Sequence, residues 1–159
     1  MLFELLVVIA LMVILTGLVG SNSSFLRKAL VRAQIEKLHT VCCYLKQLAQ
    51  VSNKQYVLRF DVDQRSYSYD NMVEILPRHL VFGVAPGILG PPSAPYKLIA
   101  RGVTFPNNQI IFYPSGIVHA GTVYISDNDY TYTYALSCAV SHFSYIRKYF
   151  YVHDWQLLV

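Results

Sequence analysis

The chain has 159 residues, which is enough for one domain or for a membrane segment followed by a domain of about 100–140 residues. Its composition is 54% hydrophobic and 14% aromatic, and a chain rich in tyrosine, valine and isoleucine favours β-structure. The formal net charge of +4 falls short of the strong basic asymmetry of a dedicated nucleic-acid-binding protein, and the basic residues are spread along the chain.

The first twenty residues form an apolar run in which Glu4 is the only ionisable side chain. A run of about 20 apolar residues is typical of a membrane-spanning helix, whereas a shorter run can belong to a signal peptide. A carboxylate within hydrocarbon is costly unless it has a partner, so neither class of segment by itself explains Glu4. We therefore expect residues 1–24 to be the transmembrane half of a long N-terminal helix that also docks specifically through Glu4.

A second helical pattern follows the Ser/Asn cluster at residues 21–24. Gly17, Gly20 and this cluster either weaken a continuous helix or cap and restart one. Apolar residues then recur at spacings of three and four, which predicts an amphipathic half of the long helix over residues 25–54. The residues expected on its apolar face are Leu26, Leu30, Ala33, Val41, Leu45 and Leu48, with Ala29, Leu38 and Ala49 beside them.

Alternating polar and apolar residues replace the helical spacing from residue 55 onward. Residues 55–61 and 65–70 predict a hairpin, and the proline- and glycine-rich residues 85–95 predict an exposed loop. Further strands are expected after Pro77 within residues 73–84 and at residues 102–105, 109–113, 121–126, 130–140 and 145–152. The chain is thus expected to be an α+β protein whose long N-terminal helix, its first half transmembrane, packs on a C-terminal antiparallel β-sheet domain over residues 55–159.

The sequence carries no pattern that favours an enzyme. Nucleophile-elbow, phosphate-binding-loop and His-Glu-x-x-His motifs are absent, and the five histidines are scattered without a repeated pairing. We therefore predict no catalytic, cofactor-binding or metal-binding residue. Cys42, Cys43 and Cys138 are expected to be buried thiols, with a bridge from Cys138 to Cys42 or Cys43 as the alternative in an oxidising compartment.

One stretch, residues 145–151, combines basic and aromatic side chains. Arg147 and Lys148 could contact phosphates of a nucleic acid while the neighbouring tyrosine rings stack on its bases. The alternative is an edge strand of a tyrosine-rich sheet, in which Lys148 opposes pairing with another chain. Both interpretations stay open at the level of the sequence.

The segment from Phe3 to Ala10, Phe-Glu-Leu-Leu-Val-Val-Ile-Ala, resembles the N-terminal methylation motif of type IV pilins and type II secretion pseudopilins. Glu4 occupies the position of the family's single acidic residue. The family's cleavage-site glycine and methylated phenylalanine would lie upstream of Met1, so the resemblance implies processing by a prepilin peptidase if a leader precedes the chain. The helix-breaking proline of the family is replaced here by Gly17, Gly20 and Ser21.

The second half of the chain more weakly resembles the H-type minor pseudopilins and their pilus-biogenesis relatives, which makes the expected fold pilin-like. The family's Phe-x-Pro-x-Gly motif followed by a Gly-Thr strand is present as residues 112–116 and 121–125. Residues 57–61 and the segment from Leu76 to Phe82 add to the likeness. Residues 141–147 stand where the family has a closing Gly-Arg hairpin.

The resemblance implies a minor pseudopilin of a type II secretion system, a structural subunit of a periplasmic pseudopilus for protein secretion. A minor type IV pilin for pilus biogenesis or DNA uptake is the alternative within the family, and a membrane-anchored enzyme is a third class. The implied location is the bacterial inner membrane, crossed once, with the β-domain in the periplasm. The implied partners are other pilin-like subunits and the inner membrane, with nucleic acid as a further candidate.

The same resemblance implies a role for the N-terminal residues in filament assembly. Glu4 would pair with the α-amine of a neighbouring subunit, and a low dielectric would make the unpaired state costly. The helix would exchange lipid for neighbouring helices. Its membrane- and filament-facing residues would be Leu5, Leu6, Val7, Val8, Ile9, Leu11, Val13, Ile14 and Leu15.

Overall fold

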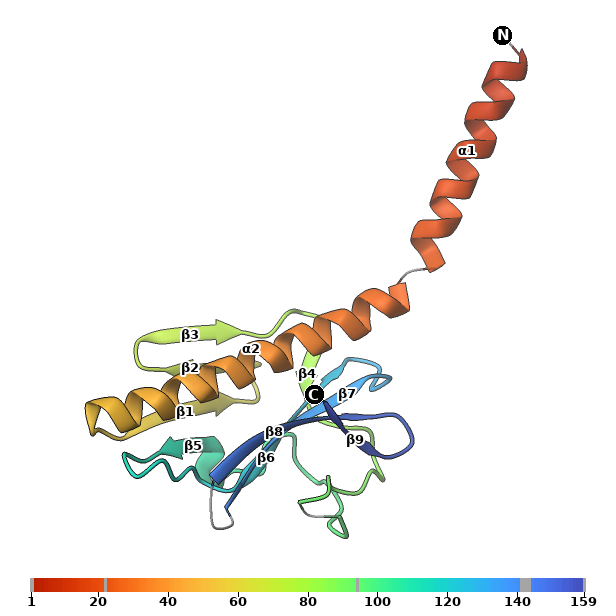
Figure 1. Ribbon diagram of the computed structural model, residues 1–159. Helices are drawn as coiled ribbons and strands as arrows, with labels where there is room; N and C mark the ends of the chain where they lie inside the picture. Colours follow the sequence, from red (N-terminus) through yellow and green to blue (C-terminus); the bar gives the residue numbers. More distant parts are fainter. Residues whose placement is uncertain (1, 22, 94, 141–143, 159) are drawn as a thin grey trace.

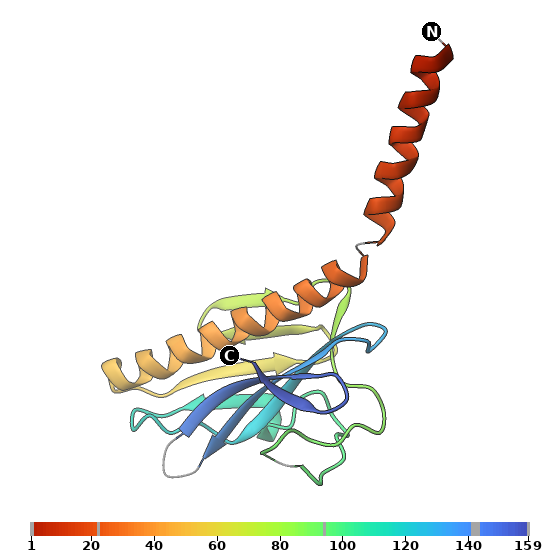
Figure 2. The same cartoon turned by 45° about the vertical axis from the view of Figure 1, so that its right-hand side comes forward.

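The computed structural model describes residues 2–21, 23–93, 95–140 and 144–158. Within these ranges the chain is an α+β protein with two helices and two antiparallel sheets. Helix α1 (Leu2–Ser21) projects away from the rest of the molecule, as the two views in Figures 1 and 2 show, and helix α2 (Ser23–Ser52) lies across the sheets.

The expectation of one long N-terminal helix with a transmembrane first half is wrong. The structure describes two helices, α1 ending at Ser21 and α2 beginning at Ser23, and the two run in different directions in Figures 1 and 2. Among the described residues, no helix reaches the length and apolarity that crossing a membrane requires.

Helix α2 buries one side against both sheets, and this side agrees with the expected one in part. Val41, Leu45, Leu38 and Ala49 are buried as predicted and Leu48 is half-buried, whereas Leu26, Ala29, Leu30 and Ala33 are exposed. The buried hydrophobic residues recur at helical spacing from residue 31 onward, and Val31, Ile35 and Cys42 among them were not expected. The buried hydrophobic residues of α2 are Val31, Ile35, Leu38, Val41, Cys42, Leu45 and Ala49.

The first sheet contains the predicted hairpin. Its strand order is β3-β2-β1-β5, and Leu58 pairs with Tyr69 within the hairpin. Residues 62–65 form the turn, where Arg65 has a positive φ of 51°. The strands are β1 (Tyr56–Asp61), β2 (Ser66–Tyr69), β3 (Met72–Ile75) and β5 (Gln109–Phe112), and the 3-10 helix η1 (Pro106–Asn108) directly precedes β5.

The second sheet has the order β4-β6-β7-β8-β9 and is antiparallel throughout. The last strand of this order was not predicted, and the strand expected at residues 102–105 is reduced to a single bridge between Val103 and Val123. The strands are β4 (Leu80–Phe82), β6 (Gly121–Asp127), β7 (Thr133–Val140), β8 (Ser144–Tyr151) and β9 (Trp155–Leu158). We refer to β1–β9 with their connecting segments as the β-domain.

The β-domain has hydrophobic residues on both faces of the second sheet. The main core lies between α2 and the two sheets, where Tyr67, Phe112 and Leu136 are fully buried. A smaller core lies on the other face, where Tyr124, Ala135, Tyr149 and Trp155 are covered by the segment 84–99. Both faces of the second sheet are therefore packed, which explains why β6 and β7 are buried along almost their whole length.

Candidate functional site

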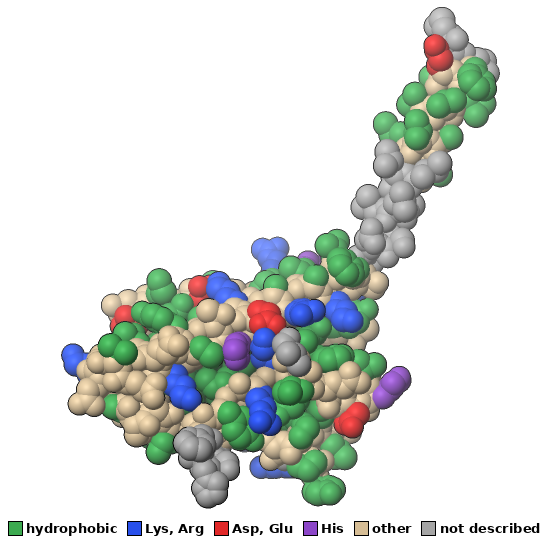
Figure 3. All heavy atoms as spheres, viewed as in Figure 1, with side chains coloured by type: hydrophobic (Ala, Val, Ile, Leu, Met, Phe, Trp, Pro, Cys, Tyr) green, Lys and Arg blue, Asp and Glu red, His purple; other side chains and the backbone are tan. Residues whose placement is uncertain are grey.

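The described side chains of α1 are exposed and apolar, apart from Glu4. Residues 3–13 lie on every side of the helix, and Figure 3 shows hydrophobic side chains along it. We call residues 3–13 without Glu4 the α1 apolar surface; its large members, each 42–79% exposed, are Phe3, Leu5, Leu6, Val7, Val8, Ile9, Leu11, Met12 and Val13. Soluble monomers rarely expose a continuous apolar surface of this extent, so it is a candidate interaction site.

Glu4 lies in the first turn of α1 and is exposed. A carboxylate in this position interacts favourably with the positive end of the helix dipole. It stands at the far end of the α1 apolar surface from the β-domain, since α1 runs outward to its N-terminus (Figure 1). The side chains of Ile14 and Leu15, which were also predicted to face the membrane or the filament, lie outside the described part of the chain.

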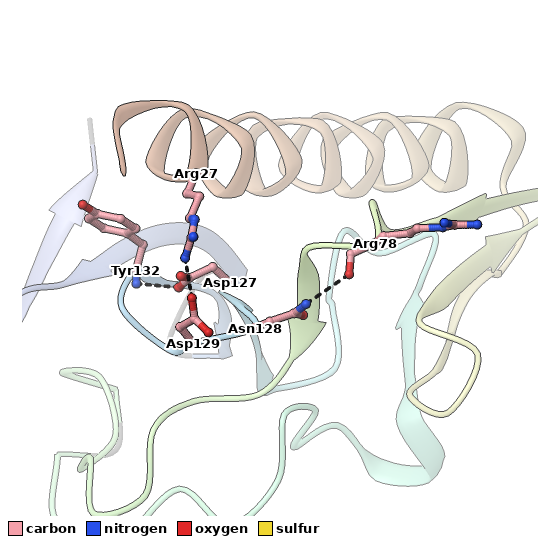
Figure 4. A network of polar contacts seen from close by, with 6 residues as sticks. All are labelled: Arg27, Arg78, Asp127, Asn128, Asp129 and Tyr132. Carbon is pink, nitrogen blue, oxygen red and sulfur yellow. Dashed lines mark hydrogen bonds and ion pairs between the residues drawn. The ribbon is translucent and has the colours of Figure 1, made fainter. Parts of the chain in front are cut away.

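An ion pair and the hydrogen bonds around it hold the beginning of α2 against the β-domain. Figure 4 shows the guanidinium group of Arg27 paired with the carboxylate of Asp129, in the turn between β6 and β7. This turn is itself held by Asp127, whose Oδ1 accepts a hydrogen bond of 2.7 Å from the backbone N–H of Tyr132. The side-chain amide of Asn128 donates to the carbonyl of Arg78, which leads into β4. These contacts fix the end of α2 from which α1 departs.

The two basic residues proposed for DNA contact lie side by side on β8 but in different surroundings. Arg147 is exposed, and its guanidinium carbon lies 4.2 Å from the centroid of the Tyr145 ring. The ammonium group of Lys148 lies 2.7 Å from Oε2 of Glu36 on α2, and its side chain is only 14% exposed. Strand β8 is not at the edge of the sheet, because it pairs with both β7 and β9. The geometry thus leaves Arg147 available to a ligand and assigns Lys148 to the contact between α2 and the sheet.

The three cysteines of the described chain are free thiols. Cys42 on α2 and Cys138 on β7 are buried in the main core, and burial raises the pKa of both, that of Cys138 to about 12. A thiol with a raised pKa stays protonated at neutral pH and is a poor nucleophile. Burial also raises the pKa of Cys43, which is half-buried. These environments favour a structural role for the thiols over a chemical one.

Comparison with known proteins identifies no relative: no family model matches the sequence, and neither curated proteins nor solved structures give a match. Among the described residues, no group of three or more His, Cys, Asp and Glu side chains is placed to hold a metal ion. The α1 apolar surface with Glu4 is the candidate functional site. Its residues stand out in the sequence, whereas its position on a projecting helix is seen only in the structure.

Proposed function

We propose that this protein is a pilin-like filament subunit, and specifically a minor pseudopilin of a type II secretion system. The observation that carries the proposal is the α1 apolar surface, which projects from a folded β-domain and is long enough to pack along neighbouring helices. Removing apolar area from water yields roughly 25 cal/mol per Å², so covering the α1 apolar surface with other apolar helices is favourable compared with leaving it in water. The resemblance of residues 3–10 to the methylation motif supplies the class of filament.

Glu4 has a separate role in this proposal, which is to set the axial position of each subunit. Its carboxylate lies in the first turn of α1, at the tip of the apolar surface. Apolar contacts alone tolerate sliding of one helix along another, whereas a charge pair in a low dielectric is strongly distance-dependent. The α-amine of an adjacent subunit is the partner that the resemblance implies. The same resemblance implies assembly at the bacterial inner membrane with the β-domain in the periplasm.

Photo-crosslinking of the full chain tests the assembly surface. A photo-activatable amino acid at Leu11 should give adducts, in cells that contain the secretion machinery, with a second copy or with another chain carrying the same N-terminal motif. Val8→Asp should abolish these adducts, because it places a carboxylate in the α1 apolar surface. Val51→Asp is the matched control, since Val51 is an 87% exposed valine at the other end of α2. Unchanged adducts in Val8→Asp would contradict the proposal.

Substitutions of Glu4 test whether its carboxylate sets the axial position of each subunit. Glu4→Gln preserves the size of the side chain and removes its charge, so we expect incorporation into filaments to be lost while the β-domain keeps its circular dichroism spectrum. Glu4→Asp keeps the charge and should retain part of the incorporation. Normal incorporation of Glu4→Gln would eliminate the proposed role of the carboxylate.

A DNA-binding minor type IV pilin is the second candidate function. The exposed Arg147 beside Tyr145 favours it, because guanidinium and phenol groups together suit phosphate contact and base stacking. Binding of this kind weakens steeply with salt, so the full chain should bind single-stranded DNA at low ionic strength and release it as salt is added. Absence of binding at low salt would dismiss this candidate.

A further inference from the structure

A cavity of about 620 Å³ lies between the second sheet and the segment that covers its outer face. Its floor comes from the beginning of β6 and the end of β7, around Thr122 and Ser137, which pair across the two strands. Its walls come from residues 97–105 of the covering segment. Cavities that hold small molecules in proteins typically measure about 300–1,000 Å³, so the size suits a small organic ligand.

Hydrogen bonds hold the covering segment in place at several points, so the cavity is preformed. The indole N–H of Trp155 donates a hydrogen bond of 2.7 Å to the carbonyl of Leu89, and the backbone N–H of Gly90 donates to the carbonyl of Lys97. At the other end, the hydroxyl of Thr104 donates to the carbonyl of Thr122 at 3.1 Å. A site held open by contacts of this kind needs little ordering when a ligand binds.

A row of hydroxyl groups runs along the floor of the cavity. The hydroxyl of Thr122 donates to that of Ser137 at 3.2 Å, and Ser137 in turn lies 3.0 Å from the hydroxyl of Ser93. Thr122 and Ser137 are buried, whereas Ser93 is exposed at the other end of the row. Hydroxyls can rotate to donate or accept, so such a row can hydrogen-bond to an anionic group.

The charge of the cavity is positive. Among the described residues that line it, Lys97 and Arg101 are basic and none is acidic. Burial raises the pKa of Tyr124 and of Cys138 to about 12, so both lining groups are neutral at physiological pH. The remaining walls are partly apolar, with Leu98, Ile99, Val103 and Phe105 near the basic residues.

We propose that this cavity binds a small organic anion that carries one apolar arm. Lys97 and Arg101 contact the anionic head, the hydroxyl row of Ser93, Ser137 and Thr122 hydrogen-bonds to it, and the apolar arm lies along the wall of residues 98–105. Carboxylates and phosphate esters share this chemistry, since both present oxygens to ammonium and guanidinium groups. The inference does not depend on the proposed filament function.

Titration of the full chain with hexanoate and with hexyl phosphate tests the proposal. Trp155 is the only tryptophan of the sequence, and its ring centroid lies 5.7 Å from that of Tyr124, which lines the cavity, so its fluorescence reports binding. We expect saturable binding of at least one of the two probes. The stronger of the two identifies the preferred anionic head, and hexanamide, which lacks the charge, should bind at least tenfold more weakly.

Substitution of the basic residues completes the test. The double variant Lys97→Gln, Arg101→Gln should weaken binding roughly tenfold or more, as expected from the loss of charge-assisted hydrogen bonds. Lys54→Gln, Arg59→Gln is the matched control, because it removes the same charges at exposed positions outside the cavity lining. Both variants replace exposed side chains, and circular dichroism checks their folding. No saturable binding of either probe, equal binding of hexanamide, or equal affinity of the two double variants would overturn the proposal.

Discussion

The ammonium group of Lys148 on β8 lies 2.7 Å from the carboxylate of Glu36 on α2, whereas the adjacent Arg147 is exposed to solvent. Successive side chains of a strand point to opposite faces, so the two neighbouring basic residues lie in different surroundings. Lys148 connects the helix to the sheet across 112 residues of sequence. Arg147 lies over the ring of Tyr145 on the other face.

Removing the charge of Lys148 should destabilise the β-domain. Lys148→Met keeps most of the apolar stem and leaves Glu36 without this partner, so we expect a loss of roughly 1 kcal/mol, reduced by solvent screening because Glu36 is 39% exposed. Urea denaturation followed by circular dichroism measures the change. Arg147→Met is the control, and its free energy of unfolding should change by less than about 0.5 kcal/mol. An equal decrease in the free energy of unfolding of both variants would show that the ion pair does not contribute to stability.

The different exposure of Arg147 and Lys148 predicts which of the two residues affects DNA binding, if the chain binds DNA. Arg147→Gln should weaken binding of single-stranded DNA and reduce the dependence of affinity on salt, because an exposed guanidinium can neutralise a phosphate. Lys148→Gln should change the affinity little, since its ammonium group is already engaged by Glu36. Fluorescence anisotropy at several salt concentrations measures both effects. A larger effect of Lys148→Gln would mean that the ion pair opens when DNA binds.

Stability should fall as the pH drops below about 6.5, because of His39. Burial lowers the pKa of His39 from its ordinary value of 6.5, Lys148 lowers it further, and Glu36 opposes the shift. The unfolded chain therefore binds the proton more readily than the folded chain, so the contribution of His39 is complete above pH 6.5 and is lost below it.

Denaturation at pH 7.5 and at pH 5.5 measures this dependence. His39→Gln cannot be protonated and should show a smaller difference in the free energy of unfolding between the two pH values than the unmodified chain. His153→Gln, which changes an exposed histidine, is the control and should retain the original difference. An unchanged difference in His39→Gln would exclude this histidine as the cause.

Gly102 should be intolerant of any side chain. A Cβ at this position would lie 2.4 Å from the backbone carbonyl of Phe82, which cannot rotate away. Gly102→Ala should therefore destabilise the chain by about 1–3 kcal/mol, as overpacking typically does. Gly83→Ala is the comparison, since its Cβ would meet only the flexible side chain of Tyr130 at 3.3 Å. Thermal unfolding of the two variants should rank Gly102→Ala as the less stable.

Local patterns predicted many elements correctly. Helix α2 and the hairpin of β1 and β2 lie where the spacing of apolar residues placed them. The strands β3 and β9 were not predicted, and the indole hydrogen bond from Trp155 of β9 to Leu89 is visible only in three dimensions. The basic residues of the cavity, Lys97 and Arg101, follow the proline- and glycine-rich loop, and nothing in their spacing indicated a shared site.

The sequence by itself determined the apolar character of α1, the presence of Glu4 in it and the change from helical to alternating periodicity near residue 55, since these depend on near neighbours along the chain. The tertiary structure decided which residues of α2 are buried, and that Arg147 faces solvent while Lys148 pairs with Glu36. It also created the cavity beneath residues 97–105. These features depend on contacts between residues far apart in the sequence, which local periodicity cannot encode.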